Sequence, residues 1–93
     1  MKDEEKMENG VVIVAVGKDK PGLIAGVTGI VSEMTGNIEE MDQVVLKDVF
    51  IMSLIVKLLN PNFPGGLERM KKLLVEQGEK IGLKVHVYDL KEL

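Results

Sequence analysis

The chain has 93 residues, a net charge of −3 at pH 7 and no cysteine. This length fits a single domain, and the lack of cysteine excludes disulfide scaffolds, iron–sulfur clusters, cysteine-bound zinc and thiol catalysis. Aromatic residues make up only 3% of the chain. Neither that scarcity nor the acidic balance suits a protein that binds nucleic acid directly.

The N-terminal segment, MKDEEKMEN, is polar and acidic. This composition predicts a flexible leader over 1–9, followed by one domain over 10–93; an interaction tail is the alternative for the leader. The segment lacks the basic start and the apolar run of a signal peptide. No apolar stretch approaches the roughly 20 residues that cross a bilayer. We therefore expect a cytoplasmic protein without a membrane segment.

The next segment, 11–16, reads VVIVAV and predicts a strand that is apolar on both faces. A turn over 18–22 leads into a helix predicted over 22–35, in which apolar residues recur at spacings of three and four. Asp19 suits the N-cap of that helix, and Gly36 suits the left-handed position after its end.

Two glycines interrupt this helix, Gly26 and Gly29. A glycine inside an exposed helix costs about 1 kcal/mol relative to alanine, so its presence calls for a reason. We expect another backbone or a ligand to approach the helix closely at both positions.

The middle of the chain predicts two strands, 38–46 and 49–58, joined by a tight turn at Lys47 and Asp48. The first strand has imperfect alternation and many charged residues, which is typical of an edge strand with a β-bulge. The second carries apolar residues on both faces. The turn lacks the Asn-Gly or Asp-Gly pair that a type I′ hairpin favours.

A proline- and glycine-rich loop over 60–66 separates these strands from a second helix, predicted over 67–81. The apolar stripe of this helix opposes a charged face, and Gly82 ends it. The last predicted strand, 83–88, alternates apolar and polar residues, as expected for an edge strand with one solvated face.

The predicted order is βαββαβ, the order of an α+β ferredoxin-like sandwich, in which a four-stranded antiparallel sheet carries two helices on one face. The strands 11–16 and 49–58 would be central, with 38–46 and 83–88 at the edges. Both central strands are also apolar on the side that the helices leave open. Such a surface usually marks an interface, so we expect a homodimer, most simply a two-fold one. Partial cover by long side chains is the alternative.

Three segments resemble the ACT domain, a small regulatory βαββαβ module of amino-acid metabolism: VVIVAVG at 11–17, KDKPGLIAGV at 18–27 and GNIEEMDQ at 36–43. More narrowly, together with EQGEKIGLKV at 76–85, they resemble the stand-alone ACT proteins of the UPF0237 group. The resemblance covers residues 10–88. The chain departs from that group at the hairpin turn and lacks its histidine-containing C-terminal segment, so no role of that segment is carried over.

The resemblance implies a site for a small effector, often an amino acid, where the first loop and helix meet a neighbouring subunit. The chemistry of the residues suits such a ligand. Backbone N–H groups in the first turn of a helix can hold a carboxylate, an asparagine side chain both donates and accepts, and Asp19 or Asp42 could receive an ammonium group. The alternative is that these residues serve only as caps and turns. The candidate ligand-binding residues are Asp19, Lys20, Pro21, Gly22, Leu23, Asn37 and Ile38.

We expect no catalytic residue, no metal and no cofactor. The chain lacks nucleophile and phosphate-loop motifs, and a lone histidine, His86, is a poor metal site without cysteine partners. An acylphosphatase-like enzyme of this topology would need an arginine in the first loop, where this chain has Lys18 and Lys20. The first hypothesis is therefore a non-catalytic regulatory module that senses an amino acid or related metabolite. The second is a dimeric protein-interaction module with no metabolite ligand.

Overall fold

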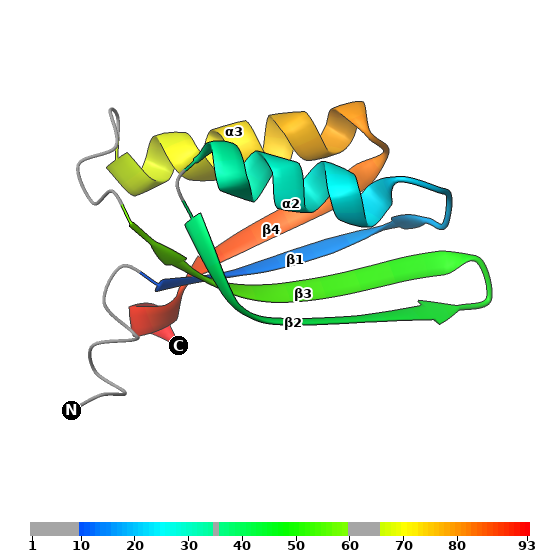
Figure 1. Cartoon of the computed structure of the whole chain (residues 1–93), viewed down its shortest axis with the longest axis horizontal. Coiled ribbons are helices and arrows are strands. Elements are labelled where there is room, and N and C mark those ends of the chain that lie inside the picture. The colour runs from blue at the N-terminus through cyan, green and yellow to red at the C-terminus, as the bar shows by residue number, and fades with distance from the viewer. Residues whose placement is uncertain (1–9, 35, 60–65) are drawn as a thin grey trace.

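The computed structural model describes residues 10–34, 36–59 and 66–93. The leader predicted over 1–9 and most of the loop predicted over 60–66 lie outside these ranges. The described part forms one four-stranded antiparallel sheet with two helices packed on one of its faces (Figure 1). Within these ranges no helix is long and apolar enough to cross a membrane.

The elements follow the predicted βαββαβ order, and the strands lie side by side in the order β2-β3-β1-β4. The ferredoxin-like prediction is therefore confirmed, with β1 and β3 at the centre of the sheet and β2 and β4 at its edges. The bounds are β1 Gly10–Lys18, α2 Leu23–Glu33, β2 Gly36–Leu46, β3 Val49–Leu58, α3 Gly66–Lys80, β4 Leu83–Asp89 and a terminal 3-10 helix, η1 Leu90–Glu92.

The start of α2 differs from the sequence prediction. Its N-cap is Gly22, which has a φ of 90° and makes no side-chain capping hydrogen bond. Asp19 lies too far ahead to cap the helix, and its backbone N–H donates to the carbonyl of Asp48 at 2.8 Å. The N-cap prediction for Asp19 is wrong because a glycine, which tolerates the left-handed conformation, makes the turn into the helix.

The end of α2 differs as well. Met34 is its C-cap, with a φ of −89°, and Gly36 already belongs to β2. The left-handed role predicted for Gly36 is therefore wrong. This position instead needs a glycine for space, because a Cβ there would lie 2.8 Å from Val56 Cγ1 and 2.9 Å from Val31 Cγ1.

The two glycines inside α2 have different surroundings. A Cβ added at Gly26 would lie 2.7 Å from Cδ1 of Ile81, just after α3. The predicted close approach exists there, but a side chain makes it rather than a backbone. A Cβ added at Gly29 would meet nothing within 4 Å, so no neighbour in the described part of the chain approaches Gly29, and the approach of a ligand there stays a prediction.

The β2–β3 hairpin carries the predicted bulge, since its register shifts between Ile38 and Glu40. Of the two turn residues, Lys47 has a positive φ of 57° and Asp48 does not. A type I′ turn needs a positive φ at both central residues. The turn is therefore not type I′, in line with its sequence.

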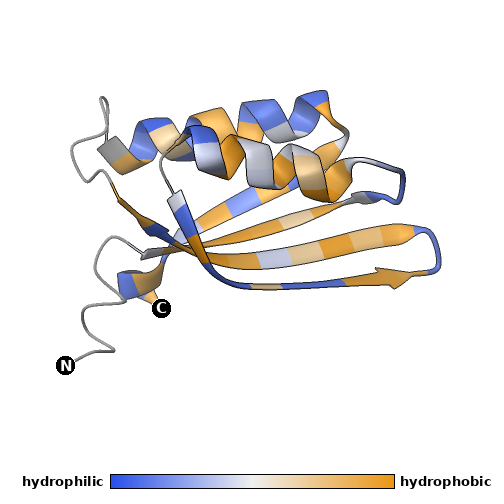
Figure 2. Cartoon of the chain, in the orientation of Figure 1, coloured by the Kyte–Doolittle hydropathy of each residue, from blue (hydrophilic) through white to orange (hydrophobic). Residues whose placement is uncertain are grey.

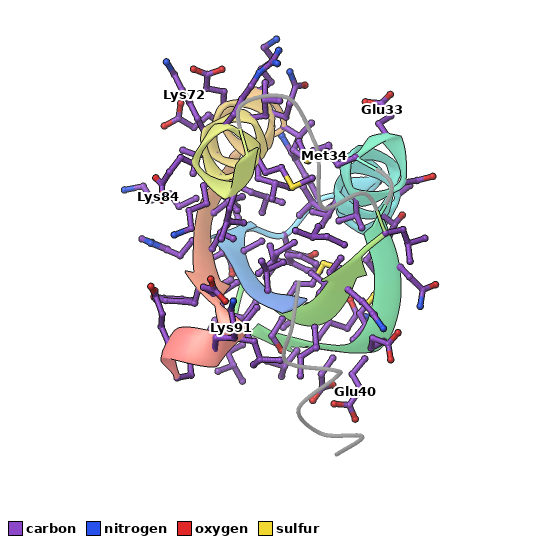
Figure 3. The ribbon with its side chains drawn as sticks, turned by 90° about the vertical axis from the view of Figure 1, so that its left-hand side faces the viewer. Glu33, Met34, Glu40, Lys72, Lys84 and Lys91 are labelled. Atoms are coloured by element: carbon purple, nitrogen blue, oxygen red, sulfur yellow. The ribbon has the colours of Figure 1, made fainter. Side chains whose placement is uncertain are left out.

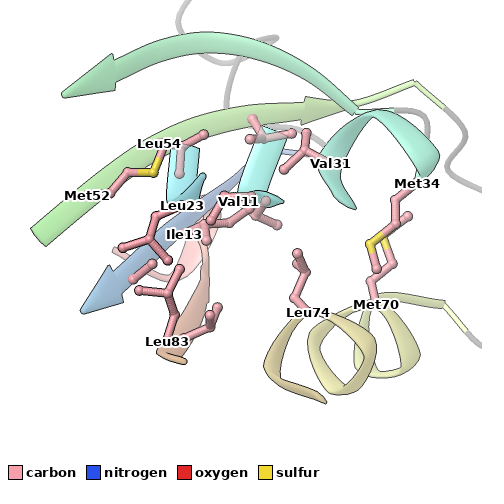
Figure 4. Close-up of a cluster of buried hydrophobic side chains, with 14 of the residues drawn as sticks. Val11, Ile13, Leu23, Val31, Met34, Met52, Leu54, Met70, Leu74 and Leu83 are labelled. Atoms are coloured by element: carbon pink, nitrogen blue, oxygen red, sulfur yellow. The ribbon is translucent and has the colours of Figure 1, made fainter. Parts of the chain in front are cut away.

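The hydrophobic core lies between the sheet and the two helices (Figure 4). Alternate residues of the central strands meet the apolar stripes of α2 and α3, and no polar or charged side chain is buried in the described ranges. Removal of this apolar surface from water is the main contribution that stabilises the fold. The buried residues are Val11, Ile13, Ala15, Leu23, Val27, Val31, Met34, Phe50, Met52, Leu54, Val56, Met70, Leu74, Leu83 and Val85.

Neither α2 nor α3 packs on the opposite face of the sheet; the short η1, which follows β4 and contacts β1, lies on this side at one end (Figure 1). Figure 2 shows the central strands, which form the middle of this face, as mostly hydrophobic ribbons. Directly paired residues point to the same side of a sheet, so the register arranges this face in rows across β2, β3, β1 and β4. We call it the open face, and its three rows are Val44, Ile51, Val16, Lys84; then Asp42, Ser53, Val14, His86; then Glu40, Ile55, Val12, Tyr88.

Candidate functional site

A hollow lies where the loop between β1 and α2 passes the end of the β2–β3 hairpin, at the right-hand end of Figure 1. Its volume is about 500 Å³, which is within the range of roughly 300–1,000 Å³ typical of small-molecule sites. We call it the loop depression. Its lining residues are Asp19, Lys20, Pro21, Gly22, Leu23, Ile24, Ala25, Gln43, Val45 and Phe50.

Two backbone features hold the loop in this place. The hydrogen bond from Asp19 N–H to the carbonyl of Asp48 ties the loop to the hairpin turn. Gly22 then turns the chain, and its carbonyl accepts the first helical hydrogen bond from the N–H of Gly26 at 2.9 Å. Because Gly22 has a left-handed backbone, any other residue there would be strained by about 1–2 kcal/mol.

The rim of the loop depression carries one charge of each sign. Asp19 and Lys20 are both exposed. The side chain of Lys20 reaches toward the turn before β4, because a Cβ added at Gly82 would lie 3.0 Å from Lys20 Nζ. The loop therefore offers a ligand one exposed amine and one exposed carboxylate.

The loop depression suits a ligand that carries both charges. The N–H groups of Leu23, Ile24 and Ala25 precede the first helical hydrogen bond and have no partner inside the helix. With the helix dipole, these groups favour an anion such as a carboxylate. The first turn of α2 holds no acidic side chain that would compete. The exposed carboxylate of Asp19 can pair with an ammonium group.

The structure brings Asp19, Lys20, Pro21, Gly22 and Leu23 together in the loop depression, as the sequence suggested. Their contributions differ in kind. The side chain of Leu23 is buried in the core with only 3% exposed, so this residue offers its backbone N–H. The charged side chains of the loop point into solvent and are available to a ligand.

Asn37 and Ile38 lie elsewhere, at the opposite end of α2. This helix has 11 residues and is therefore about 16 Å long, which separates the start of β2 from the loop depression. The side-chain amide of Asn37 donates to Glu39 Oε2 at 2.8 Å, and Ile38 packs against the core. A single chain does not bring these two residues to the loop depression.

The sequence prediction missed Gln43, Val45 and Phe50, which form the hairpin wall of the depression. Gln43 and Val45 face the helix side of β2, because they pair with the buried residues Met52 and Phe50. Asp42, the other candidate for an ammonium group, faces the open side instead. The alternation along this strand could have separated these faces, but the bulge hides its register, and nothing local links the hairpin to the first loop.

Comparisons with known proteins identify the family of the chain. Residues 9–88 match the family model of the ACT domain. The chain belongs to the ACT domain family. A UPF0237 protein of Methanopyrus kandleri is 34% identical over 76 residues, which are 82% of each chain. A UPF0237 protein of Methanococcus maripaludis is 35% identical over 81 residues, 87% of each chain. The resemblance to the UPF0237 group is therefore confirmed.

Solved structures show the same fold. An ACT domain protein from Streptococcus pneumoniae has a TM-score of 0.75 and 28% identity, over 84% of this chain and 85% of that one. A formyltetrahydrofolate deformylase from Pseudomonas putida has a TM-score of 0.73 and 15% identity, and the match covers 28% of its chain, so the likeness is one of fold alone. ACT domains are regulatory modules that bind small molecules. In the described ranges of this ACT domain, no cluster of three or more histidine, aspartate or glutamate residues could hold a metal ion.

Proposed function

We propose that this ACT domain is a non-catalytic, cytoplasmic regulatory module that binds an amino acid or a related metabolite in the loop depression, where a second copy of the chain completes the site. The observation that carries this proposal is that the residues lining one hollow include both Asp19 and the first residues of α2, whose N–H groups have no partner inside the helix. An amino acid carries a carboxylate and an ammonium group on one carbon, so it can use both at once.

The hairpin wall supplies the rest of the recognition. Val45 is 46% exposed and lies beside Phe50, and together they offer an apolar surface to the side chain of a ligand. Gln43 adjoins them and can both donate and accept a hydrogen bond. Apolar walls with a few placed polar groups are typical of small-molecule sites.

A second chain would add Asn37 to this site. In the described sheet, β2 lies at the edge with one side unpaired. Two chains that pair along this edge about a two-fold axis have antiparallel β2 strands, so the start of one strand lies beside the end of the other. Asn37 of the second chain then approaches Gln43 and Val45 of the first, which explains how residues at opposite ends of α2 can serve one ligand.

Thermal unfolding in the presence of each of the twenty amino acids tests the proposal. We expect at least one of them to raise the unfolding temperature, because a ligand at 100 times its dissociation constant adds about 2.7 kcal/mol to the stability of the folded state. If none raises it and the oligomeric state is intact, the amino-acid proposal is wrong.

One substitution tests where the ligand binds. Ala25 is exposed in the first turn of α2, so Ala25→Glu keeps the helix stable, since an acidic residue suits a helix N-terminus. Its carboxylate would compete with the carboxylate of the ligand, and we expect the affinity to fall about tenfold or more, or 1.4 kcal/mol. Ser32→Glu, at the other end of the same helix, is the matched control and should leave the affinity unchanged.

The second candidate function is a dimeric interaction module with no metabolite ligand. The apolar open face favours it, because a large exposed apolar surface marks an interaction site. It predicts an oligomer whose unfolding temperature responds to none of the twenty amino acids. The panel above therefore separates the two functions directly.

A further inference from the structure

We propose that the open face of the sheet packs on the open face of a second copy of this chain, with the two-fold axis parallel to the strands. The acidic edge of one copy, on β2, then lies over the basic edge of the other, on β4. This interface is separate from the loop depression, which lies on the helix side of the sheet, so the inference does not depend on the ligand.

The centre of the open face is apolar except for Ser53. Val12, Val14 and Val16 of β1 and Ile51 and Ile55 of β3 all point to this side and are half-buried in the single chain. Branched aliphatic side chains in the middle of a sheet suit contact with a second sheet, as in sandwiches whose inner faces interdigitate. On the helix side, the equivalent residues of these strands are buried.

The two edges of the open face carry opposite charge. Glu40 and Asp42 lie on β2, and the paired rows place Tyr88 and His86 at the other edge, on β4, with Lys84 in the next row. In Figure 3, Glu40 points away from the helices, on the side of the molecule opposite Lys72. The face therefore has an acidic side, an apolar middle and a side with hydrogen-bond donors and a positive charge.

This pattern selects one of the two symmetric ways to stack the sheets. An axis parallel to the strands places β2 of one copy over β4 of the other and keeps each row on its own row. Asp42 then lies over His86 of the second copy and Glu40 over Tyr88, and Lys84 lies one row from Asp42. An axis across the strands would stack β2 over β2 and bring Asp42 onto its own copy, where like-charge repulsion is not offset by the backbone hydrogen bonds that two β2 edges form when they pair side by side.

The apolar middle and the outlying lysines also fit the first arrangement. It places the β3 residues Ile51 and Ile55 over Val16 and Val12 of the second copy. Lys18 shares a row with Val49, and Lys57 with Gly10, so neither lysine meets a like charge.

Four strands at about 4.8 Å spacing and nine residues at about 3.4 Å give an open face of roughly 19 by 30 Å. This footprint, about 570 Å², is about 70% of the roughly 800 Å² per partner of a standard interface.

Charge reversal in solution tests the orientation. The first variant is Glu40→Lys with Asp42→Lys, and the second is Lys84→Glu with His86→Glu. Each gives both edges of the open face the same sign of charge, so we expect the dissociation constant for self-association, measured by sedimentation equilibrium, to rise about tenfold or more. The variant with all four substitutions restores complementary edges and should return to within a few-fold of the wild-type value. Lys72→Glu, on the far side of α3, is the matched control and should change nothing.

A variant at the centre tests the face itself. Val14→Asp should halve the mass in solution, with the secondary structure retained by circular dichroism. If this variant fails to fold, the charge-reversal variants still test the interface, because the residues that they replace are exposed at the edges of the sheet. A wild-type chain whose mass does not change with any of these substitutions would overturn the proposal. A wild-type chain that is a monomer, and that self-associates only after residues 1–9 are removed, would also overturn the proposal, because the leader would then cover the open face.

Discussion

The two faces of the sheet are built from the same strands and the same kinds of side chain, yet only one is covered. On β3, Leu54 points to the helices and is 1% exposed. The next residue, Ile55, points to the open face and is half-buried. Most residues of β1 and β3 are apolar on both sides of the sheet, so hydrophobicity alone does not tell the two faces apart. The difference lies in what each face meets, two helices of its own chain or, as we propose, a second copy.

The uncovered apolar face indicates where a small domain can gain stability. A chain of this size buries only about 60–65% of the surface that its unfolded form exposes. A core on one side of the sheet therefore leaves a thin margin, and apolar residues on the other side gain by association. The effect of a substitution on the free energy of unfolding should then depend on protein concentration for the open face and not for the covered face, because association stabilises only the folded state.

The largest expected effect comes from the neighbours Leu54 and Ile55. Leu54→Ala removes a fully buried side chain and should lower the free energy of unfolding by about 2–5 kcal/mol, by the same amount at every protein concentration. Ile55→Ala should cost less in dilute solution and should weaken the rise of stability with concentration. Urea unfolding at low and high protein concentration measures both. Equal and concentration-independent losses would remove the distinction between the faces.

A smaller effect tests how tightly the covered face is packed. Gly17 lies on that face, and a Cβ added there would overlap the carbonyl oxygen of Gly82 and lie 2.8 Å from Leu83 Cδ2. Because a backbone atom cannot move aside cheaply, Gly17→Ala should lower the free energy of unfolding by about 1–3 kcal/mol. Ser53→Ala, in the exposed centre of the open face, is its counterpart. It should change that free energy by less than about 0.5 kcal/mol, and a larger loss would mean that the open face packs within the single chain.

The smallest effect is expected at a residue that lies on neither face of the sheet. Gly29 lies inside α2, and an added Cβ meets nothing. Gly29→Ala should raise the free energy of unfolding by about 0.5–1 kcal/mol, because alanine favours the helix and restricts the unfolded chain. Thermal unfolding measures the gain. A loss would show that Gly29 is in contact with another molecule, as its place in the helix first suggested.

Much of the fold follows from short-range patterns in the sequence. Alternation placed the apolar residues of β3 on two faces, and helical spacing selected the stripe of α2 that reaches the core. The acidic edge strand and its bulge near Glu39 followed from broken alternation. The caps of α2 did not follow, because Gly22 and Asp19 are both suitable turn residues and only the path of the chain decides between them.

The candidate site was predictable only in part. Asp19 to Leu23 adjoin one another in the sequence, so any fold that forms the loop brings them together. Gln43 and Val45 join them only through the pairing of β2 with β3 and the hydrogen bond between Asp19 and Asp48. Asn37 belongs to the site only if a second chain supplies it, and one sequence does not show the arrangement of two chains.

The most direct test of the proposed regulatory role is an amide proton–nitrogen NMR titration of the chain, using the amino acid that gives the largest thermal shift. We expect the peaks that move on binding to come from residues 19–25 and from Gln43, Val45 and their neighbours at the hairpin end, with Asn37 responding if a second chain completes the site. Shifts confined to the open face, or no shifts at ligand concentrations that raise the unfolding temperature, would contradict the account.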